Sequence, residues 1–415
     1  MKFSVRKKFL EGTSEDRRLY LTRAAQRVVI LLAVIAAVLG IYYFRNDISA
    51  WFREVQARQQ ADETPESPSY HRIAFEPDSD NVYALFGESL VVINQGNFKI
   101  YSADGTEQLA LQLSYSRPAL CVSDEQIIAY DRGGTNLTVA SQNALIGTLE
   151  IPGNIISVEA NGSGYFAVTH EDERYRAVVS VYDNRQNLVY RWQTSEYYVM
   201  RASLAPDGSS MTATAFTQDD GNFISRMFYF DLSRSDGYRA TADISGTIIT
   251  NSYYIANDTV CLVGDDRAVV TDVDGNTLYE YEYGNDMIKT GAASDGYVVL
   301  TMLDRTSGLG AKMVLFTPDA DAALVTNTND DIRKMAACGD YIAVLYTQGV
   351  QLFNGSLEPL SAEVDVSQVR DILVGEDGMV LLIYASDAGY VDLLSAFTNG
   401  SVSDGGTGVD ETEGE

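Results

Sequence analysis

Two neighbouring stretches, ESLVVINQGNFKIYSADGTEQLALQL (Glu88–Leu113) and EQIIAYDRGGTNLTVASQNALIGTLEI (Glu125–Ile151), align as two copies of one unit. In both copies an apolar run, a polar turn, a second apolar run, another turn and an alternating run follow in the same order. Short apolar runs that are bounded by Gly, Asn and Asp indicate β-strands rather than helices. The chain is therefore predicted to be all-β and built from repeats.

The same unit restarts six more times along the chain. These starts are GYFAVT at Gly164, SMTATAF at Ser210, TVCLVG at Thr259, GYVVLTM at Gly296, DYIAVLY at Asp340 and GMVLLIY at Gly378. A period of about 37 to 50 residues is typical of propeller blades with four strands each. We predict an eight-bladed β-propeller over residues 70–398, with a seven-bladed ring as the alternative.

The last unit offers one strand fewer than the others. It supplies three apolar runs, the last of them Gly389–Phe397, and is followed by a polar tail. Upstream of the first unit, Tyr70–Phe75 is an alternating run without a partner in its own unit. Because an open outer edge invites aggregation, we expect Tyr70–Phe75 to pair with Gly389–Phe397 and to close the ring.

Residues 28–44 (VVILLAVIAAVLGIYYF) carry no charge. As a helix, this segment would span about 26 Å of the roughly 30 Å hydrocarbon layer of a membrane. Eight basic residues precede it in residues 1–27, and no small-x-small cleavage site follows it, which favours an uncleaved anchor over a signal peptide. The positive-inside rule places the head in the cytoplasm and the C-terminal domain outside.

The segments that flank the propeller have simpler compositions. Residues 45–69 end in ADETPESPS, which predicts a stalk and a flexible linker. Residues 399–415 consist mainly of Gly, Ser, Asp and Glu and are predicted to form a disordered acidic tail.

The distribution of charge limits the class of partner. The net charge of the chain is −28 and residues 1–27 carry +5, so residues 28–415 carry −33. A field of this sign repels phosphate backbones and argues against nucleic-acid binding. The partners expected of the propeller are a neutral or basic protein or a cell-wall ligand, besides the membrane itself.

The residues that catalysis or cofactor binding would need are scarce. The chain has two histidines, and His170 lies in HEDERYR, which reads as a charged loop in solvent. Asp272-Val-Asp-Gly-Asn276 resembles a calcium loop, but no bidentate acid follows at the right distance, so we interpret it as a turn. The repeated tryptophans that dock the blades of quinone-dependent propeller dehydrogenases are missing, since residues 70–398 contain only Trp192. We predict no catalytic residue, no metal and no cofactor.

Three of the predicted loops between second and third strands are long and lie on one face of the disc. They are His170–Arg176, Thr217–Asn222 and Asp304–Gly310. Insertions on one face of a repeat protein often mark its binding face, although surface loops also tolerate insertions without any function. The candidate binding residues are His170, Glu171, Asp172, Arg174, Asp219, Asp220, Asp304 and Arg305.

The order of parts resembles an uncharacterised family of membrane-anchored β-propeller proteins from Gram-positive bacteria, domain of unknown function 5711. The resemblance is carried by strand starts such as Gly164-Tyr-Phe-Ala-Val, Gly296-Tyr-Val-Val-Leu and Asp340-Tyr-Ile-Ala-Val, and it covers the chain except for the acidic tail. It implies a plasma-membrane protein that faces the cell wall. It implies no active site.

Three functions are compatible with these features. The first is a binding or scaffolding propeller at the cell envelope, which needs nothing that the sequence lacks. The second is a sensor or adaptor, in which the basic head of residues 1–27 attracts anionic lipid or a partner. The third is a hydrolase or lyase, which would need paired carboxylates in the central funnel.

Overall fold

A computed structural model describes residues 72–395, except 220, 235–236, 305–310 and 329–330. The chain divides after Ser69, and the described residues all belong to the second unit. The proposed anchor at residues 28–44, the linker and the tail of residues 399–415 lie outside the described residues. Within the described part, no helix has the length and apolarity that crossing a membrane requires.

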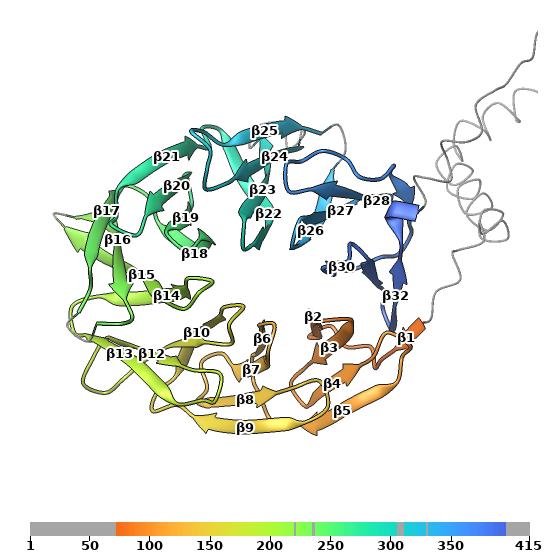
Figure 1. Cartoon of the computed structure of the whole chain (residues 1–415), viewed down its shortest axis with the longest axis horizontal. Coiled ribbons are helices and arrows are strands. Elements are labelled where there is room, and N and C mark those ends of the chain that lie inside the picture. Colours follow the sequence, from red (N-terminus) through yellow and green to blue (C-terminus); the bar gives the residue numbers. More distant parts are fainter. Residues whose placement is uncertain (1–71, 220, 235–236, 305–310, 329–330, 396–415) are drawn as a thin grey trace, which may run out of the picture. The chain divides into compact units, whose positions relative to one another are not determined.

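In the part of the chain that the structure describes, thirty-two strands form eight four-stranded antiparallel sheets, which are arranged as blades around a central axis (Figure 1). The predicted eight-bladed propeller is confirmed, and the seven-bladed alternative is wrong. The strands of blades 1 to 4 are β2 (Val82–Phe86), β3 (Ser89–Ile93), β4 (Asn97–Tyr101), β5 (Glu107–Gln112); β6 (Pro118–Val122), β7 (Ile127–Asp131), β8 (Asn136–Ala140), β9 (Leu145–Glu150); β10 (Ile155–Ala160), β11 (Phe166–His170), β12 (Ala177–Tyr182), β13 (Leu188–Thr194); and β14 (Tyr198–Leu204), β15 (Ser210–Asp219), β16 (Asn222–Asp231), β17 (Ala240–Ser245).

Blades 5 to 7 repeat this order, and blade 8 completes it with the first strand of the chain. Their strands are β18 (Ile249–Ala256), β19 (Thr259–Gly264), β20 (Arg267–Asp272), β21 (Thr277–Glu282); β22 (Asp286–Ser294), β23 (Tyr297–Asp304), β24 (Ala311–Phe316), β25 (Leu324–Asn327); β26 (Ile332–Cys338), β27 (Tyr341–Tyr346), β28 (Gly349–Asn354), β29 (Val364–Asp365); and β30 (Asp371–Val374), β31 (Val380–Ile383), β32 (Asp387–Val391), β1 (Arg72–Ala74).

The position of a strand in its blade decides its burial. Second strands such as β3, β7 and β19 are buried at every residue, because both of their faces pack on neighbouring blades. Outer strands such as β17 alternate between partly buried and exposed residues. Each interface between blades is thus a separate small apolar core, which is how a chain of this length avoids the need for a single large one.

The ring closes as predicted, through pairing of β1 with β32 (Figure 1). Ile73 lies opposite Ala388 and is fully buried in an apolar cluster that contains residues of blades 1 and 8. Gly105, at a φ of +85°, leaves room for the backbone of β1, since a Cβ there would lie 3.1 Å from the Arg72 carbonyl oxygen. The Tyr390 hydroxyl donates to the Glu88 carbonyl oxygen at 2.8 Å and joins blade 8 to blade 1.

The third strand of blade 8, β32, is shorter than expected. It ends at Val391, whereas the sequence predicted a strand to Phe397. Asp392 ends it, because its Oδ1 accepts hydrogen bonds from the backbone N–H groups of Leu394 and Ser395, each at 3.0 Å. A side chain that satisfies the backbone locally competes with the sheet ladder.

The topology divides the turns between the two faces of the disc. Turns between the second and third strands, and the connections between blades, lie on one face, which we call the BC face. Turns between the first and second strands, and between the third and fourth, lie on the other, which we call the AB face. The Asp272 loop is an AB-face turn, as interpreted, since Asp272 Oδ1 accepts the Asp274 and Asn276 N–H groups at 2.9 and 2.8 Å.

Candidate functional site

Blade 4 carries a hairpin that projects on the BC face. Its strands β15 and β16 have ten residues each and pair as far as Asp219 and Asn222. The neighbouring strand β14 stops at the level of Phe216, and β17 stops at Ile224. The expectation of a long loop at Thr217–Asn222 is therefore wrong, because the strand pairing continues almost to the tip.

Three aromatic residues gather on the projecting end, and we call them the aromatic tip: Tyr198, Phe216 and Phe223. Tyr198 pairs with Phe216 across the sheet, and the Phe216 and Phe223 rings stack at 5.0 Å. Tyr198 is 57% exposed and Phe223 is 51% exposed. The Arg176 guanidinium, which comes from the blade 3 loop, lies over the Tyr198 ring at 4.7 Å. The loops of blades 3 and 4 thus meet at one apolar surface.

The candidate residues of the blade 3 loop take different positions from one another. His170 is the last residue of β11 and is fully buried, so the expectation of a histidine in solvent is wrong. Its Nδ1 lies 2.8 Å from the Glu171 carbonyl oxygen, and burial lowers the pKa of the imidazole. Asp172 accepts the Arg174 N–H at 2.8 Å, and this bond holds the pKa of the Asp172 carboxyl below its usual range.

The other candidate residues do not form one cluster with these. Asp304 ends β23 and lies opposite Asp286 in the sheet of blade 6. Asp219 closes the blade 4 hairpin opposite Asn222. Asp220 and Arg305 lie outside the described residues. The structure therefore joins the loops of blades 3 and 4, whereas Asp304 lies in blade 6, two blades away from the hairpin of blade 4.

A pocket of about 200 Å³, which we call the central pocket, lies at the inner strands of blades 3 to 6. Its lining includes the carboxyl groups of Glu159 and Asp295 and the hydroxyl groups of Ser203 and Ser252. Arg201 holds Glu159 at 2.7 Å. Burial raises the pKa of the Glu159 carboxyl, and the Arg201 guanidinium opposes that rise. Loss of solvent, and then the Asp124 carboxylate, raise the pKa of Asp295.

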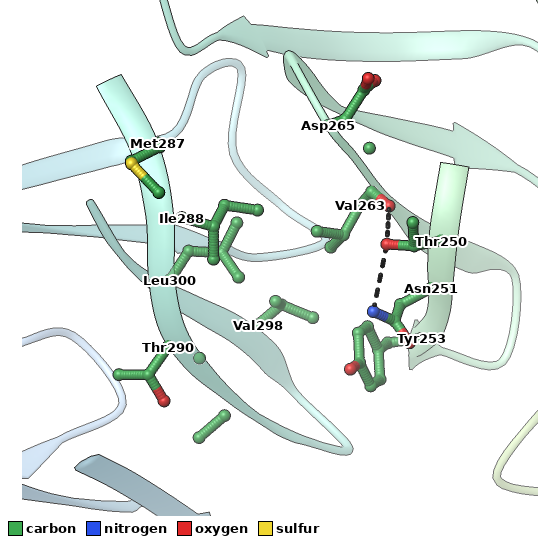
Figure 2. A pocket seen from close by; sticks show the side chains of 13 residues that line it. Thr250, Asn251, Tyr253, Val263, Asp265, Met287, Ile288, Thr290, Val298 and Leu300 are labelled. Atoms are coloured by element: carbon green, nitrogen blue, oxygen red, sulfur yellow. Dashed lines mark hydrogen bonds between the residues drawn. The ribbon is translucent and has the colours of Figure 1, made fainter. Parts of the chain in front are cut away.

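A larger pocket, of about 530 Å³, lies between blades 5 and 6 (Figure 2). The middle and outer strands of these blades share one apolar core, but Tyr253 and Ile288 on the inner strands β18 and β22 are only partly buried at its edge. The lining combines aliphatic side chains such as Ile288, Val298 and Leu300 with Thr250, Asn251 and Asp265. Tyr253 lines this pocket and the central one.

The comparisons with known proteins concern the whole propeller. A family of unknown function, DUF5711, matches residues 67–393. This chain belongs to the DUF5711 family. No curated protein matches the sequence.

Two solved structures are similar to this DUF5711 protein. The C-terminal WD40 domain of Sif2 is 12% identical, with 78% of this chain and 97% of that chain covered and a TM-score of 0.51. BamB from Moraxella catarrhalis is 13% identical, with 77% and 96% covered and a TM-score of 0.48. At 12% identity, the likeness to the Sif2 domain shows the propeller fold alone.

Neither pocket of the DUF5711 domain was expected from the sequence. Glu159 and Arg201 are the charged residues of the inner strands β10 and β14, and this was the available signal for the central pocket. Among the residues that the structure describes, no three His, Cys, Asp or Glu side chains are placed to hold a metal ion. The three cysteines are free, and burial raises the pKa of each thiol.

Proposed function

We propose that this DUF5711 protein is a membrane-anchored, extracytoplasmic binding module that holds a protein partner at the aromatic tip of blade 4. The observation that carries the proposal is the exposure of Tyr198 and Phe223 at the end of a projecting, fully paired hairpin. Aromatic residues are enriched at protein interfaces, and contiguous exposed apolar surface often marks one. Met200, which is also exposed, lies in β14, the strand that pairs with β15.

The chemistry of the partner follows from the charge of the domain. Residues 28–415 carry −33, so the partner presents an apolar contact surface with a neutral or basic rim. The same field disfavours nucleic acids and anionic lipid. Residues 28–44 would anchor the chain and place the propeller at the cell envelope, where such a partner would be a secreted or wall-associated protein.

The sensor and the hydrolase remain alternative proposals with weaker support. A hydrolase would use the central pocket, where Glu159 and Asp295 supply carboxyl groups. Arg201 holds the Glu159 carboxyl at 2.7 Å, and although burial raises the pKa of this carboxyl, the ion pair leaves it less free to act on a substrate. A sensor would need a link between the propeller and residues 1–27, and these residues are too few to form a signalling domain.

Photo-crosslinking in intact cells tests the binding proposal. Benzoylphenylalanine at Phe223 should give a discrete protein adduct, and Tyr198→Ser should reduce its yield. The matched control is benzoylphenylalanine at Leu278, which is 49% exposed on the outer strand β21. Equal adducts from both positions, or no protein adduct from Phe223, would refute a partner at the tip. A lipid adduct from Phe223 would show that the tip contacts the membrane instead.

A further inference from the structure

We propose that the pocket between blades 5 and 6 binds an organic amine with an aliphatic or aromatic body. This site is separate from the aromatic tip and does not depend on the function proposed for it. The pocket measures about 530 Å³, within the range of about 300 to 1,000 Å³ that is usual for small-molecule sites. It lies at the edge of the apolar core that blades 5 and 6 share.

The apolar part of the site is the inner edge of the core between blades 5 and 6. Val263, Val298 and Leu300 belong to this core and also line the pocket. On the side of β22, the lining includes Gly291 and the small residue Ala292. Gly291 lets β22 lie close to β23, since a Cβ there would lie 2.8 Å from Leu300 Cδ2.

The polar side of the pocket is formed by Thr250 and Asn251, which a chain of hydrogen bonds holds in place without a ligand. Arg201 donates to Asn251 Oδ1 at 2.7 Å, and Asn251 Nδ2 donates to Thr250 Oγ1 at 3.3 Å. Thr250 in turn donates to the Val263 carbonyl oxygen at 3.3 Å, and Figure 2 shows the last two of these bonds. A preorganised wall loses little conformational entropy on binding.

The charge of the ligand follows from Asp265. It is the only residue of the thirteen lining the pocket that carries a formal charge at neutral pH. Its side chain lies toward one end of the pocket (Figure 2), and its Oδ1 accepts the Ile248 N–H at 2.8 Å. A carboxylate has a second oxygen that can accept from an ammonium group. An anionic ligand would meet both this carboxylate and the negative field of the whole domain.

Binding can be tested with three matched compounds and the purified full-length chain. They are 4-phenylbutylamine, 4-phenylbutanol and 4-phenylbutyrate, which share a body and differ in charge. We expect saturable binding in the order amine, alcohol, acid, measured by saturation-transfer NMR. Asp265→Asn should weaken binding of the amine about two- to fivefold, as expected for an exposed ion pair, and leave the alcohol unchanged. Asp319→Asn, an exposed acid in a turn of the same blade as β22 but on the AB face, is the charge control.

Two further variants locate the site. Ala292→Phe should fill the pocket and abolish binding, provided that its melting temperature shows a folded domain. Independently, Met287→Cys places a thiol at a pocket residue that is 47% exposed, and the amine should slow its alkylation by iodoacetamide. Leu278→Cys, equally exposed on β21, should react at an unchanged rate. The proposal is overturned if the amine does not bind saturably, if the acid binds as well as the amine, or if Met287→Cys is not protected.

Discussion

At the scale of residues, tyrosine hydroxyls join neighbouring blades. Each hydroxyl forms a hydrogen bond with a threonine or a carbonyl oxygen of an adjacent blade. Examples are Tyr229 to Thr271 at 2.8 Å, Tyr254 to Thr212 at 2.9 Å and Tyr297 to the Tyr341 carbonyl oxygen at 3.0 Å. A tyrosine ring supplies apolar contact area, and its hydroxyl makes the contact directional.

Tyr254→Phe should therefore lower the free energy of unfolding by about 1 to 2 kcal/mol, because it leaves the buried Thr212 hydroxyl without this partner. Tyr254 is 6% exposed and Thr212 is fully buried. Urea denaturation of the variant measures the effect. Tyr198→Phe, at a position that is 57% exposed, should change stability by less than about 0.5 kcal/mol. Equal losses in the two variants would contradict the role given to the Tyr254 hydrogen bond.

The buried His170 makes stability depend on pH. Burial lowers the pKa of its imidazole in the folded state, while the unfolded chain binds a proton below a pH of about 6.5. The unfolded state then holds more protons, so the free energy of unfolding falls as the pH drops through this value. We expect His170→Gln to lose less melting temperature between pH 7.5 and pH 5.5 than the natural chain. Parallel curves for the two proteins would mean that His170 does not titrate in this way.

At the scale of elements, three residues of β1 complete a sheet whose other strands come from the opposite end of the domain. Among the described residues, the pairing of β1 with β32 is the only strand pairing that joins the two ends of the domain. The apolar cluster beneath β1 contains residues of blades 1 and 8. Loss of β1 would therefore disrupt the interface between these two blades as well as expose the edge of β32.

Ile73→Asp should destabilise the domain by about 3 kcal/mol or more, because it removes core contacts and buries a charge. Ala74→Asp, at the neighbouring exposed position of the same strand, is the matched control and should change little. Thermal unfolding compares the two. A truncated chain that begins at Asp78 should likewise melt below one that begins at Ser69. If these two truncated chains melt together, β1 does not stabilise the ring.

At the scale of the whole molecule, the acids are arranged around the axis of the propeller. Seven of the eight turns between first and second strands carry at least one acid, and none of the eight carries Lys or Arg. These residues are Glu88, Asp124, Glu125, Asp207, Asp258, Asp295, Asp340, Glu376 and Asp377. The AB face is therefore strongly negative near the axis, and anionic polymers should be repelled from it.

The proposed anchor gives a prediction for the orientation of the whole chain. Protease added outside intact cells should digest the propeller and leave the residues before Val28 protected. Ala36→Arg, in the middle of residues 28–44, should impair membrane insertion by about 2.5 to 3.5 kcal/mol. Conservative Ala36→Leu is the control and should insert normally. A mature chain that begins after Phe44 would contradict the anchor.

Only the structure decided between eight blades and seven. The sequence by itself determined the propeller fold, the strand order and the closure of the ring. These features follow from local patterns. The alternation of apolar and polar residues in a strand predicts how deeply the strand is buried in its blade, and the strand missing from the last unit is supplied by an unpaired run before the first unit. Tyr70–Phe75 could be matched to the last unit because only these two runs lacked partners. Repeats also keep neighbours in sequence close in space.

Only the tertiary structure decided the extent of the blade 4 hairpin, the burial of His170 and the two pockets. Each depends on groups far apart in the chain. His170 is buried because it packs inside the sheet of blade 3, although its neighbours in sequence are charged. The pocket between blades 5 and 6 exists because Tyr253 and Ile288 on β18 and β22 stay at the edge of the shared core. The distance between β18 and β22 cannot be predicted from the residue pattern of either strand, because each strand forms its backbone hydrogen bonds within its own sheet.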